Sequence, residues 1–208
     1  LAPIVDDPAA VRPAAGALDV LAALADRAAV VGVVSGRPVS VLARLLPDPR
    51  LRLAGLYGLE RRVEGTVVDA PEADRWREPI AAAADRLATL VPTGVEVEAK
   101  RLSITVHHRR APEAADAAAA AAAQVASDLG LAVRPARMAV EVHPPEGPDK
   151  GTVVTDLAAG CGAACFVGDD VGDVPAFSAL DRLAGRGVVV AKVAVDGPEA
   201  PTALLEAA

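Results

Sequence analysis

Short apolar runs alternate with segments of helical apolar spacing along residues 1–60. Apolar residues recur on one helical face between residues 13 and 27, which predicts a helix there. Residues 29–34 form a β-branched apolar run without polar alternation, typical of a strand buried on both faces of a parallel sheet. A second helix is predicted over 39–46 and another strand over 51–56. This order indicates an α/β fold.

The middle of the chain has a different pattern, because apolar and polar residues alternate in its strands. The predicted strands are 95–98, 102–107 and 138–143. Strict alternation indicates strands with one covered and one solvated or cleft-lining face, as in an antiparallel sheet. Two helices, over 73–90 and 112–129, separate these strands. The middle segment is therefore predicted to be a small α+β module.

The α/β pattern resumes after the breaker-rich residues 144–148. The predicted elements are a helix over 150–159, a fully apolar strand over 164–167, a helix over 175–183 and a strand over 188–190. We therefore expect residues 1–60 and 144–208 to form one parallel-sheet domain into which an α+β domain, 61–143, is inserted.

The amino-acid composition excludes several classes of protein. Of the 208 residues, 52% are hydrophobic, and the formal net charge is −7. So much apolar surface excludes an intrinsically disordered chain, and the acidic balance argues against a nucleic-acid binder. No apolar stretch reaches the length of a membrane span. Cys161 and Cys165 are too few for a disulfide framework and lack the neighbours of a zinc site. We expect a cytoplasmic protein that binds a small molecule.

Two predicted strand ends carry polar residues suited to a ligand, because ligands of open parallel sheets sit beyond the carboxyl ends of the strands. Ser35 and Arg37 follow the first strand and offer a hydroxyl and a cation before a helix N-terminus. Asp169, Asp170 and Asp173 follow the strand over 164–167. Carboxylates so crowded are costly unless a cation is bound, and hard oxygen ligands suit Mg²⁺.

Each feature also has a plainer interpretation. Ser35 alone serves equally well as a helix N-cap. For the aspartates, a solvated turn with an N-cap carboxylate is the less favoured interpretation. Lys150, one of three lysines, is best explained by itself as an exposed surface charge. Taken together with the acidic turn and Ser35, its ammonium gains a role, because it can balance phosphate and carboxylate charge around a metal.

These residues, in this order, resemble the motifs of the haloacid dehalogenase (HAD) superfamily of phosphotransferases. Ser35 corresponds to its second motif, Lys150 to its third, and the turn from Gly168 to Asp173 to its acidic fourth motif. The resemblance implies a Rossmann-like parallel-sheet core, and the inserted module resembles the C2-type cap of that superfamily.

A narrower resemblance, to the trehalose 6-phosphate phosphatase family, runs over nearly the whole chain. It is carried by Leu1-Ala2-Pro3-Ile4 with Asp7-Pro8, Val33-Val34-Ser35-Gly36-Arg37-Pro38, Gly55-Leu56-Tyr57-Gly58-Leu59-Glu60, Glu98-x-Lys100 before Leu102-Ser103, His107-His108-Arg109, Val140-Glu141-Val142 and Asp149-Lys150-Gly151. The fragments are individually short, and their order and spacing carry the match. The implied activity is hydrolysis of trehalose 6-phosphate to trehalose and phosphate through an aspartyl-phosphate, in trehalose biosynthesis.

The resemblance assigns roles residue by residue. Ser35 and Lys150 would stabilise the transferring phosphoryl group, and Asp169, helped by Asp173, would hold Mg²⁺. The residues that would bind the substrate are Arg37, Glu98, Lys100 and Glu141. Without the resemblance, Glu98 and Lys100 are equally well explained as a solvated ion pair on one strand face. His107, His108 and His143 are expected to be ordinary strand residues rather than metal ligands.

The sequence departs from the family pattern at several positions. The first motif, Asp-x-Asp-Gly-Thr, carries the nucleophile and the general acid/base and would stand immediately before Leu1; it is not found in residues 1–208. Asp6 and Asp7 match the loop after that motif, so they are not substitutes. Residues 1–208 are therefore expected to be a truncated chain, inactive alone. Tyr57 stands where many members have His, Gly172 where many have Thr, and His143 where Arg is common.

Three alternatives remain open from the sequence. One is another HAD sugar phosphatase acting on sucrose 6-phosphate or a glucosylglycerol phosphate. The second is a non-catalytic sugar-phosphate binding domain, and the third is a Rossmann-like domain with an acidic surface loop. A trehalose-phosphate synthase is a further expectation, as partner or as fused domain.

Overall fold

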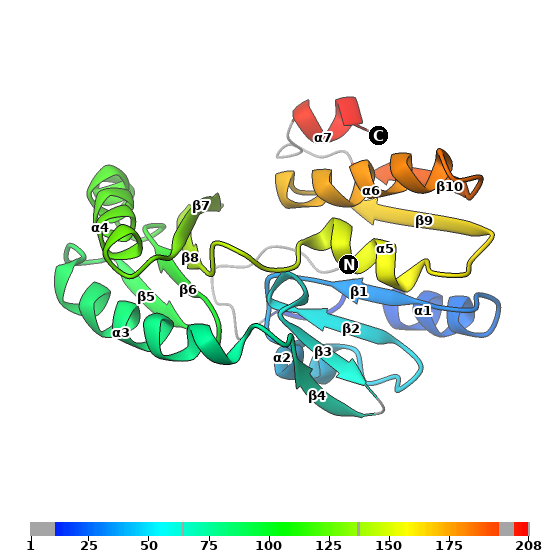
Figure 1. The fold of residues 1–208 in the computed structure, drawn as a ribbon, viewed down its shortest axis with the longest axis horizontal. Coiled ribbons are helices and arrows are strands. Elements are labelled where there is room, and N and C mark those ends of the chain that lie inside the picture. Colours follow the sequence, from blue (N-terminus) through cyan, green and yellow to red (C-terminus); the bar gives the residue numbers. More distant parts are fainter. Residues whose placement is uncertain (1–10, 64, 137, 196–201, 208) are drawn as a thin grey trace. The chain divides into compact units, whose positions relative to one another are not determined.

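The computed structural model describes residues 11–63, 65–136, 138–195 and 202–207. Asp6 and Asp7, on which part of the motif comparison rests, lie outside this described part. The chain divides into two compact units (Figure 1). The inserted unit is Asp69–Gly147, and the core unit comprises the described residues through Val68 together with those from Pro148 onward.

The core unit contains two sheets. The first has the order β1 (Gly32–Val34), β2 (Arg52–Gly55), β3 (Glu60–Val63) and β4 (Thr66–Asp69), and the second pairs β9 (Ala163–Gly168) with β10 (Val189–Ala194). The helices are α1 (Ala17–Ala25), α2 (Val39–Leu45), α5 (Lys150–Leu157), α6 (Val174–Ala184) and α7 (Thr202–Ala207), with short 3-10 turns at Leu56–Gly58 and Val171–Asp173. Strands β1 and β2 are parallel, as are β9 and β10.

Two apolar clusters hold the core unit together. The first packs α1 and α2 against β1 and β2, and the second packs α5 and α6 against β9 and β10. Phe177, one of two phenylalanines in the chain, is fully buried and meets Phe166 edge-on, with ring centroids 6.0 Å apart. The other clustered side chains are aliphatic, as the composition leads one to expect.

The burial of these strands differs from the sequence prediction. Residues 29–34 were predicted to form a strand buried on both faces, but β1 begins only at Gly32 and only Val33 in it is buried. This prediction is wrong because, among the described residues, β1 ends its sheet and pairs only with β2. In β9, Ala163, Cys165 and Val167 are exposed and alternate with more buried residues.

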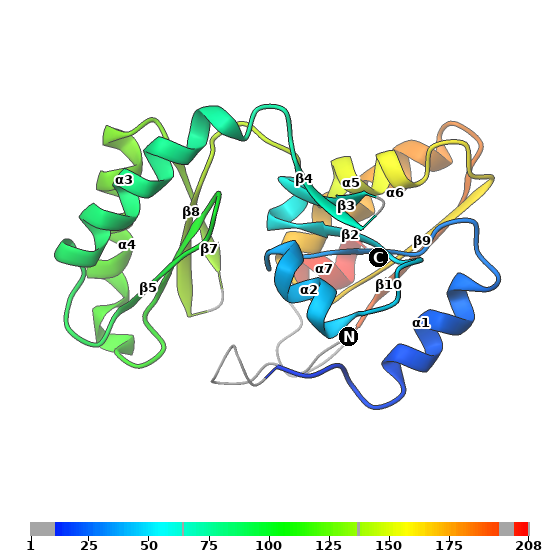
Figure 2. The ribbon, with the colours of Figure 1, turned by 90° about the horizontal axis from the view of Figure 1, so that it is seen from below.

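The inserted unit is a four-stranded antiparallel sheet with helices on one face. The strand order is β5 (Glu96–Ala99), β6 (Ile104–His107), β8 (Ala139–His143) and β7 (Ala132–Ala136). Figure 2 shows α3 (Asp74–Leu90) and α4 (Ala115–Asp128) beside each other on one side of this sheet. Ile104, Val106 and Val142 join the helical residues in a fully buried cluster, so the alternate residues of these strands face away from the helices.

The unit boundaries fall later than the sequence placed them. β3 and β4 continue the sheet of β2, so the first boundary lies after Val68 rather than near residue 60. The second lies after Gly147, at the end of the breaker-rich segment. No helix in the described ranges has the length and apolar character needed to cross a membrane.

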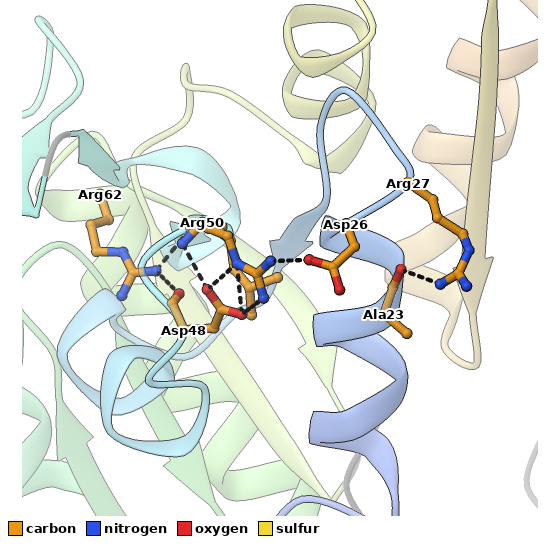
Figure 3. Close-up of polar contacts among 7 residues, drawn as sticks. Ala23, Asp26, Arg27, Asp48, Arg50 and Arg62 are labelled. Carbon is orange, nitrogen blue, oxygen red and sulfur yellow. Dashed lines mark hydrogen bonds and ion pairs between the residues drawn. The ribbon is translucent and has the colours of Figure 1, made fainter.

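An arginine cluster on the surface joins the end of α1 to the start of β2 (Figure 3). Arg50 donates from Nη2 to Asp48 Oδ2 at 2.7 Å and from Nη1 to Asp26 Oδ1 at 2.5 Å. Arg62 donates to the carbonyl oxygens of Asp48 and Leu51. The hydrogen bonds from Arg50 lower the pKa of the Asp48 carboxyl to about 2, so this carboxylate stays ionised at every ordinary pH.

Candidate active site

The loop after β1 places Ser35 at the carboxyl end of the strand. The Ser35 N–H donates to the carbonyl of Ala54 at 3.0 Å, and its Oγ accepts from the N–H of Arg37 at 3.1 Å. The loop is thereby fixed to the neighbouring strand β2. The alternative that Ser35 is the helix N-cap is wrong, because α2 begins at Val39 and its N-cap position is Pro38.

A buried glutamate takes the capping role instead. The Val39 N–H donates to Glu60 Oε2 at 2.9 Å, and Glu60 is 1% exposed. A carboxylate at a helix N-terminus satisfies an orphan donor and opposes the positive end of the helix dipole. The sequence analysis missed this role, since Glu60 lies 21 positions from Val39 and no local spacing connects them.

A strained turn brings Tyr57 over the Ser35 loop. Leu56, Tyr57 and Gly58 have φ values of 48°, 60° and 110°, a left-handed conformation that costs of order 1–3 kcal/mol at each non-glycine residue. The Tyr57 N–H donates to the carbonyl of Ser35 at 2.9 Å. A Cβ atom added at Gly36 would lie 2.8 Å from the Tyr57 ring, so the ring and the loop backbone are in direct contact. The strain is retained at the carboxyl end of the strands, where ligands bind.

Lys150 and Asp173 form a buried ion pair in the same unit. Lys150 is the first residue of α5, and its Nζ donates to Asp173 Oδ1 at 2.5 Å. The two side chains are 11% and 4% exposed. The interpretation of Lys150 as an exposed surface charge is therefore wrong. Nζ also lies 5.8 Å from the centroid of the Tyr57 ring, which connects the Ser35 loop to the acidic turn.

The other carboxylate oxygen of Asp173 closes the acidic turn. Oδ2 accepts from the backbone N–H groups of Asp169 at 2.9 Å and Asp170 at 3.0 Å. Gly168 is needed beside it, because a Cβ there would lie 2.6 Å from the Asp173 side chain. The interpretation of the aspartates as a solvated turn is wrong for Asp173, which is 3% exposed. Its other part, an N-cap carboxylate, is confirmed, because Asp170 caps the 3-10 turn that follows.

The acidic turn has carboxylates left for a cation. Both oxygens of Asp173 already accept hydrogen bonds, and the Asp170 side chain accepts one from the Asp173 N–H. Asp169 and Asp170 are exposed at the end of β9. Exposed carboxylate oxygens are ligands that Mg²⁺ accepts, often with water completing its shell. Within the described ranges, no group of three or more His, Cys, Asp or Glu side chains is placed to hold a metal by itself. The turn therefore fits a partly hydrated cation held by one or two carboxylates.

The second group of predicted residues lies on the helix-free face of the inserted sheet. Antiparallel register places Glu98 opposite Thr105, Thr105 opposite Glu141, and Glu141 opposite Arg134, which makes one polar row across all four strands. Arg134 Nε donates to Glu141 Oε2 at 3.0 Å, and the Glu141 side chain is 4% exposed. We call these four residues the polar row.

Lys100 lies between the two carboxylates of the polar row. Its Nζ is 4.0 Å from Glu98 Oε2 and 3.9 Å from Glu141 Oε1, and its side chain is 12% exposed. The simple solvated pair of Glu98 and Lys100 is therefore wrong, because the lysine is largely covered and bridges two carboxylates. His107 Nε2 lies 3.0 Å from Glu98 Oε2 and adds a second contact to that side chain.

His143 belongs to the same unit and is kept neutral by its surroundings. Burial and the nearby Arg134 charge lower its pKa below the usual 6.5, although Glu141 and the bond to the Pro144 carbonyl act in the opposite direction. Its Nδ1 lies 2.7 Å from that carbonyl oxygen. His143 is the last residue of β8, and its ring bonds to the backbone carbonyl of the following residue; that it is not a metal ligand stays a prediction.

The structure thus brings the predicted residues together in two groups, one per unit. The core unit holds Ser35, Arg37, Lys150, Asp169 and Asp173, and the inserted unit holds Glu98, Lys100 and Glu141. Sequence reasoning missed Thr105 and Arg134, both members of the polar row. The signal available for Thr105 was its alternation with Ile104 and Val106, which places it on the face of the strand opposite to theirs.

Solved structures share this fold. The chain superposes over 97% of its length on 84% of a chain described as "trehalose-6-phosphate phosphatase related protein", with a TM-score of 0.81 and 22% identity. It superposes over 98% of its length on 81% of the C-terminal domain of Candida albicans trehalose-6-phosphate phosphatase, with a TM-score of 0.80 and 21% identity. The fold is therefore that of the HAD-type phosphatases, an α/β core with an inserted cap, as the sequence predicted.

The sequence comparisons identify the family within that class. The profile of the family described as trehalose-phosphatase matches residues 1–205, so the chain belongs to the trehalose-phosphatase family. It is 35% identical over 218 residues to the trehalose-phosphate phosphatase of Mycobacterium avium, which covers 98% of this chain and 55% of the relative. It is 30% identical over 179 residues to the enzyme of Escherichia coli, covering 83% of this chain and 66% of that one. The chain spans about half the length of the mycobacterial relatives it matches.

Proposed function

We propose that the chain belongs to a Mg²⁺-dependent phosphatase that hydrolyses trehalose 6-phosphate to trehalose and phosphate. Two contacts of Lys150 in the core unit carry the proposal. Its ammonium donates a hydrogen bond to Asp173 and lies over the ring of Tyr57. The backbone N–H of Tyr57 in turn donates to the Ser35 carbonyl. Three elements distant in sequence thereby place a cation, a hydroxyl and an acidic turn together. Curated relatives with 30–35% identity carry the name of this activity.

Lys150 and Ser35 are the proposed phosphoryl-binding groups. The Lys150 ammonium carries three protons, of which one is donated to Asp173, so two remain for phosphate oxygens. The Ser35 hydroxyl accepts from the Arg37 N–H and keeps its own proton for donation. Phosphoryl transfer spreads negative charge over the equatorial oxygens, so prepositioned donors lower its barrier. Arg37 adds a cation on the same loop.

The acidic turn is the proposed metal end of the site. Asp169 would ligate Mg²⁺, which when bound neutralises charge on the transferring phosphoryl group. Asp173 supports this end from within, because it binds the backbone of Asp169 and fixes Lys150. Direct ligation by Asp173 would use the second lone pair of Oδ1, beside the hydrogen bond from Lys150.

The resemblance assigns the nucleophile to the Asp-x-Asp-Gly-Thr motif. In the family's chemistry a carboxylate oxygen attacks phosphorus, the sugar oxygen leaves with a proton from a second carboxylic acid, and water then cleaves the acyl phosphate. The Asp-x-Asp-Gly-Thr motif that supplies both carboxylates does not occur in the printed sequence. We therefore expect residues 1–208 alone to release no phosphate, whereas their binding groups remain.

The helix-free face of the inserted sheet is the proposed sugar site. Glu98, Lys100 and Glu141 present acceptors and a donor that a disaccharide's hydroxyl groups require. Arg37 is proposed to contact the substrate from the phosphate side. A charged, half-buried face of this kind selects a ligand by hydrogen bonds rather than by apolar contact.

The proposal is tested by phosphate release from a substrate panel. The protein as its gene encodes it is given trehalose 6-phosphate, sucrose 6-phosphate and a glucosylglycerol phosphate, with Mg²⁺ or with excess chelator. We expect trehalose 6-phosphate to be preferred by at least about tenfold in kcat/KM, on the order of one buried hydrogen bond, with the activity lost on chelation. Equal rates on all three esters, or unchanged rates without the metal, would contradict it.

A trehalose-phosphate synthase as partner or fused domain stays a prediction. One structural neighbour is titled Candida albicans trehalose synthase regulatory protein C-terminal domain, and it shares the fold at a TM-score of 0.68 and 16% identity. Co-purification of a synthase with the tagged protein from its own cells is the direct test, and its absence would remove the expectation of a separate partner.

A further inference from the structure

The polar row contains a buried hydroxyl that makes no hydrogen bond with any described residue. Thr105 is 6% exposed, and its Oγ1 is inaccessible and makes no hydrogen bond in the described structure. Buried hydroxyl groups in proteins are nearly always paired, because an unpaired one has lost its water without compensation. Valine at this position would fill nearly the same volume and avoid that loss. The hydroxyl therefore calls for a partner other than the described residues, and a bound ligand can be that partner.

The orientation of Thr105 places this hydroxyl on the helix-free face. Its strand neighbours Ile104 and Val106 pack into the apolar cluster under α3 and α4, so Thr105 points to the opposite side. There it stands directly between Glu98 on one neighbouring strand and Glu141 on the other. Side chains opposite each other in antiparallel strands lie about 5 Å apart at their Cβ atoms.

A second unpaired atom adjoins it. Glu141 Oε2 accepts from Arg134, whereas Glu141 Oε1 is buried and makes no hydrogen bond. Lys100 Nζ lies 3.9 Å from Oε1, which is beyond hydrogen-bonding distance. The row therefore holds one unused donor, the Thr105 hydroxyl, beside one unused acceptor, the Glu141 carboxylate oxygen.

A single alcohol group satisfies both atoms. We propose that Thr105 is a specificity-determining residue whose hydroxyl donates to one hydroxyl oxygen of the sugar, while that same sugar hydroxyl donates to Glu141 Oε1. Arg134 acts as a positioning residue, because its bond to Oε2 turns Oε1 toward the ligand. This inference rests on the proposed sugar-phosphate function and goes beyond it by naming Thr105 as the donor. Glu98 and Lys100 lie beside Thr105 and Glu141 and are further polar contacts for the sugar on this proposal.

The proposal predicts that Thr105→Val weakens substrate binding without lowering the stability of the free protein. Removal of an unpaired buried hydroxyl leaves the free protein as stable as before or more stable, so the melting temperature stays equal or rises. The same removal deletes a contact to the sugar, so the KM for trehalose 6-phosphate rises roughly three- to tenfold while kcat stays within about twofold. Thr105→Ser keeps the hydroxyl and is expected to keep the wild-type KM.

The experiment uses the protein as its gene encodes it and measures phosphate release together with thermal unfolding. Each variant is assayed on trehalose 6-phosphate and on p-nitrophenyl phosphate, which carries no sugar hydroxyls and is expected to be unaffected. Thr89→Val is the matched control, because Thr89 lies on α3 of the same unit and its Oγ1 donates to the Arg86 carbonyl at 2.8 Å. This control is expected to leave both KM values unchanged.

Three results would overturn the inference. They are an unchanged KM for trehalose 6-phosphate in Thr105→Val, an equal rise in KM for both esters, or a melting temperature lowered by several degrees, which would mean that the hydroxyl serves the fold. A wild-type protein that neither binds nor hydrolyses trehalose 6-phosphate would remove the proposed function as well, and so separates the two failures.

Discussion

The two groups of polar residues differ in how many of their buried polar atoms make hydrogen bonds within the described structure. In the core unit Asp173 uses both oxygens, on Lys150 and on two backbone N–H groups. In the inserted unit Thr105 Oγ1 and Glu141 Oε1 are buried without a hydrogen bond. The first group is thus preorganised by its own bonds, as electrostatic stabilisation of a reacting group requires. If the proposed sugar site is right, a ligand completes the second group, and its residues contribute to affinity more than to stability.

The largest expected effect comes from Asp173→Ala. The change leaves the Lys150 ammonium and two N–H groups without their acceptor, so the free energy of unfolding should fall by about 3 kcal/mol, as when a buried ion pair loses one partner. Urea denaturation measures it. Asp169→Ala, at an exposed position of the same turn, is the control and should stay within about 0.5 kcal/mol of wild type. Equal losses in the two variants would show that Asp173 does not hold the turn.

Gly55→Ala is expected to lower the free energy of unfolding by a smaller amount. A Cβ at this position would lie 2.5 Å from the Val39 nitrogen and 2.7 Å from the Arg37 carbonyl oxygen, so the Ser35 loop must shift. Overpacking of this kind costs about 1–3 kcal/mol. Gly162→Ala, where an added Cβ meets nothing within 4 Å and φ is not in the left-handed region, is the matched control. If both variants unfold at the wild-type urea concentration, the tight contact between loop and strand does not exist.

The pH dependence of the inserted unit should show the effect of His143. Burial lowers its pKa in the folded state below 6.5, so the unfolded chain takes up the proton first as the pH falls. The contribution of neutral His143 to the free energy of unfolding is therefore complete above pH 6.5. It is lost as the pH falls from 6.5 through the folded-state pKa of this residue. Melting temperatures between pH 8 and pH 5.5 should fall more steeply for wild type than for His143→Gln. Parallel curves for the two proteins would contradict this account.

The smallest effect is expected from Arg50→Ala. The hydrogen bonds from Arg50 lower the pKa of Asp48 from 3.8 to about 2. The contribution of this ion pair to the free energy of unfolding is therefore present above pH 3.8 and is lost as the pH falls through about 2. Both side chains are accessible to water, so salt should screen the contribution at neutral pH. Thermal unfolding of wild type and variant in 0.05 M and 1 M salt measures it. A difference that survives in 1 M salt would point to packing rather than charge.

The sequence predicted those strands and helices whose apolar residues recur on one face because that face packs into an apolar cluster. The alternation of β6 and β8 follows from one face packed on α3 and α4, and this pattern also placed Glu141 on the opposite face. β3 and β4 were missed because they are short and carry no clear alternation. β7 was missed because Pro135 disfavours a strand, yet β7 is the edge of its sheet, where proline is tolerated.

Within the site, local chemistry predicted residues but not their partners. The crowding of Asp169, Asp170 and Asp173 was visible in the sequence, whereas the engagement of Asp173 with Lys150 depends on the packing of α5 against α6. The left-handed turn at Leu56 and Tyr57 had no sequence signal, because neither residue favours a positive φ. Tertiary contacts outweigh that preference, and this is why Tyr57 reaches Lys150.

The central claim is that the core unit handles the phosphate and the inserted unit handles the sugar. The most direct test compares Lys150→Met with Glu141→Gln on trehalose 6-phosphate and p-nitrophenyl phosphate. We predict that Lys150→Met lowers kcat on both esters by at least about a hundredfold, as loss of a charged transition-state donor does. Glu141→Gln should raise KM for trehalose 6-phosphate alone. If Glu141→Gln impairs both esters equally, or Lys150→Met leaves p-nitrophenyl phosphate turnover intact, this division of roles is wrong.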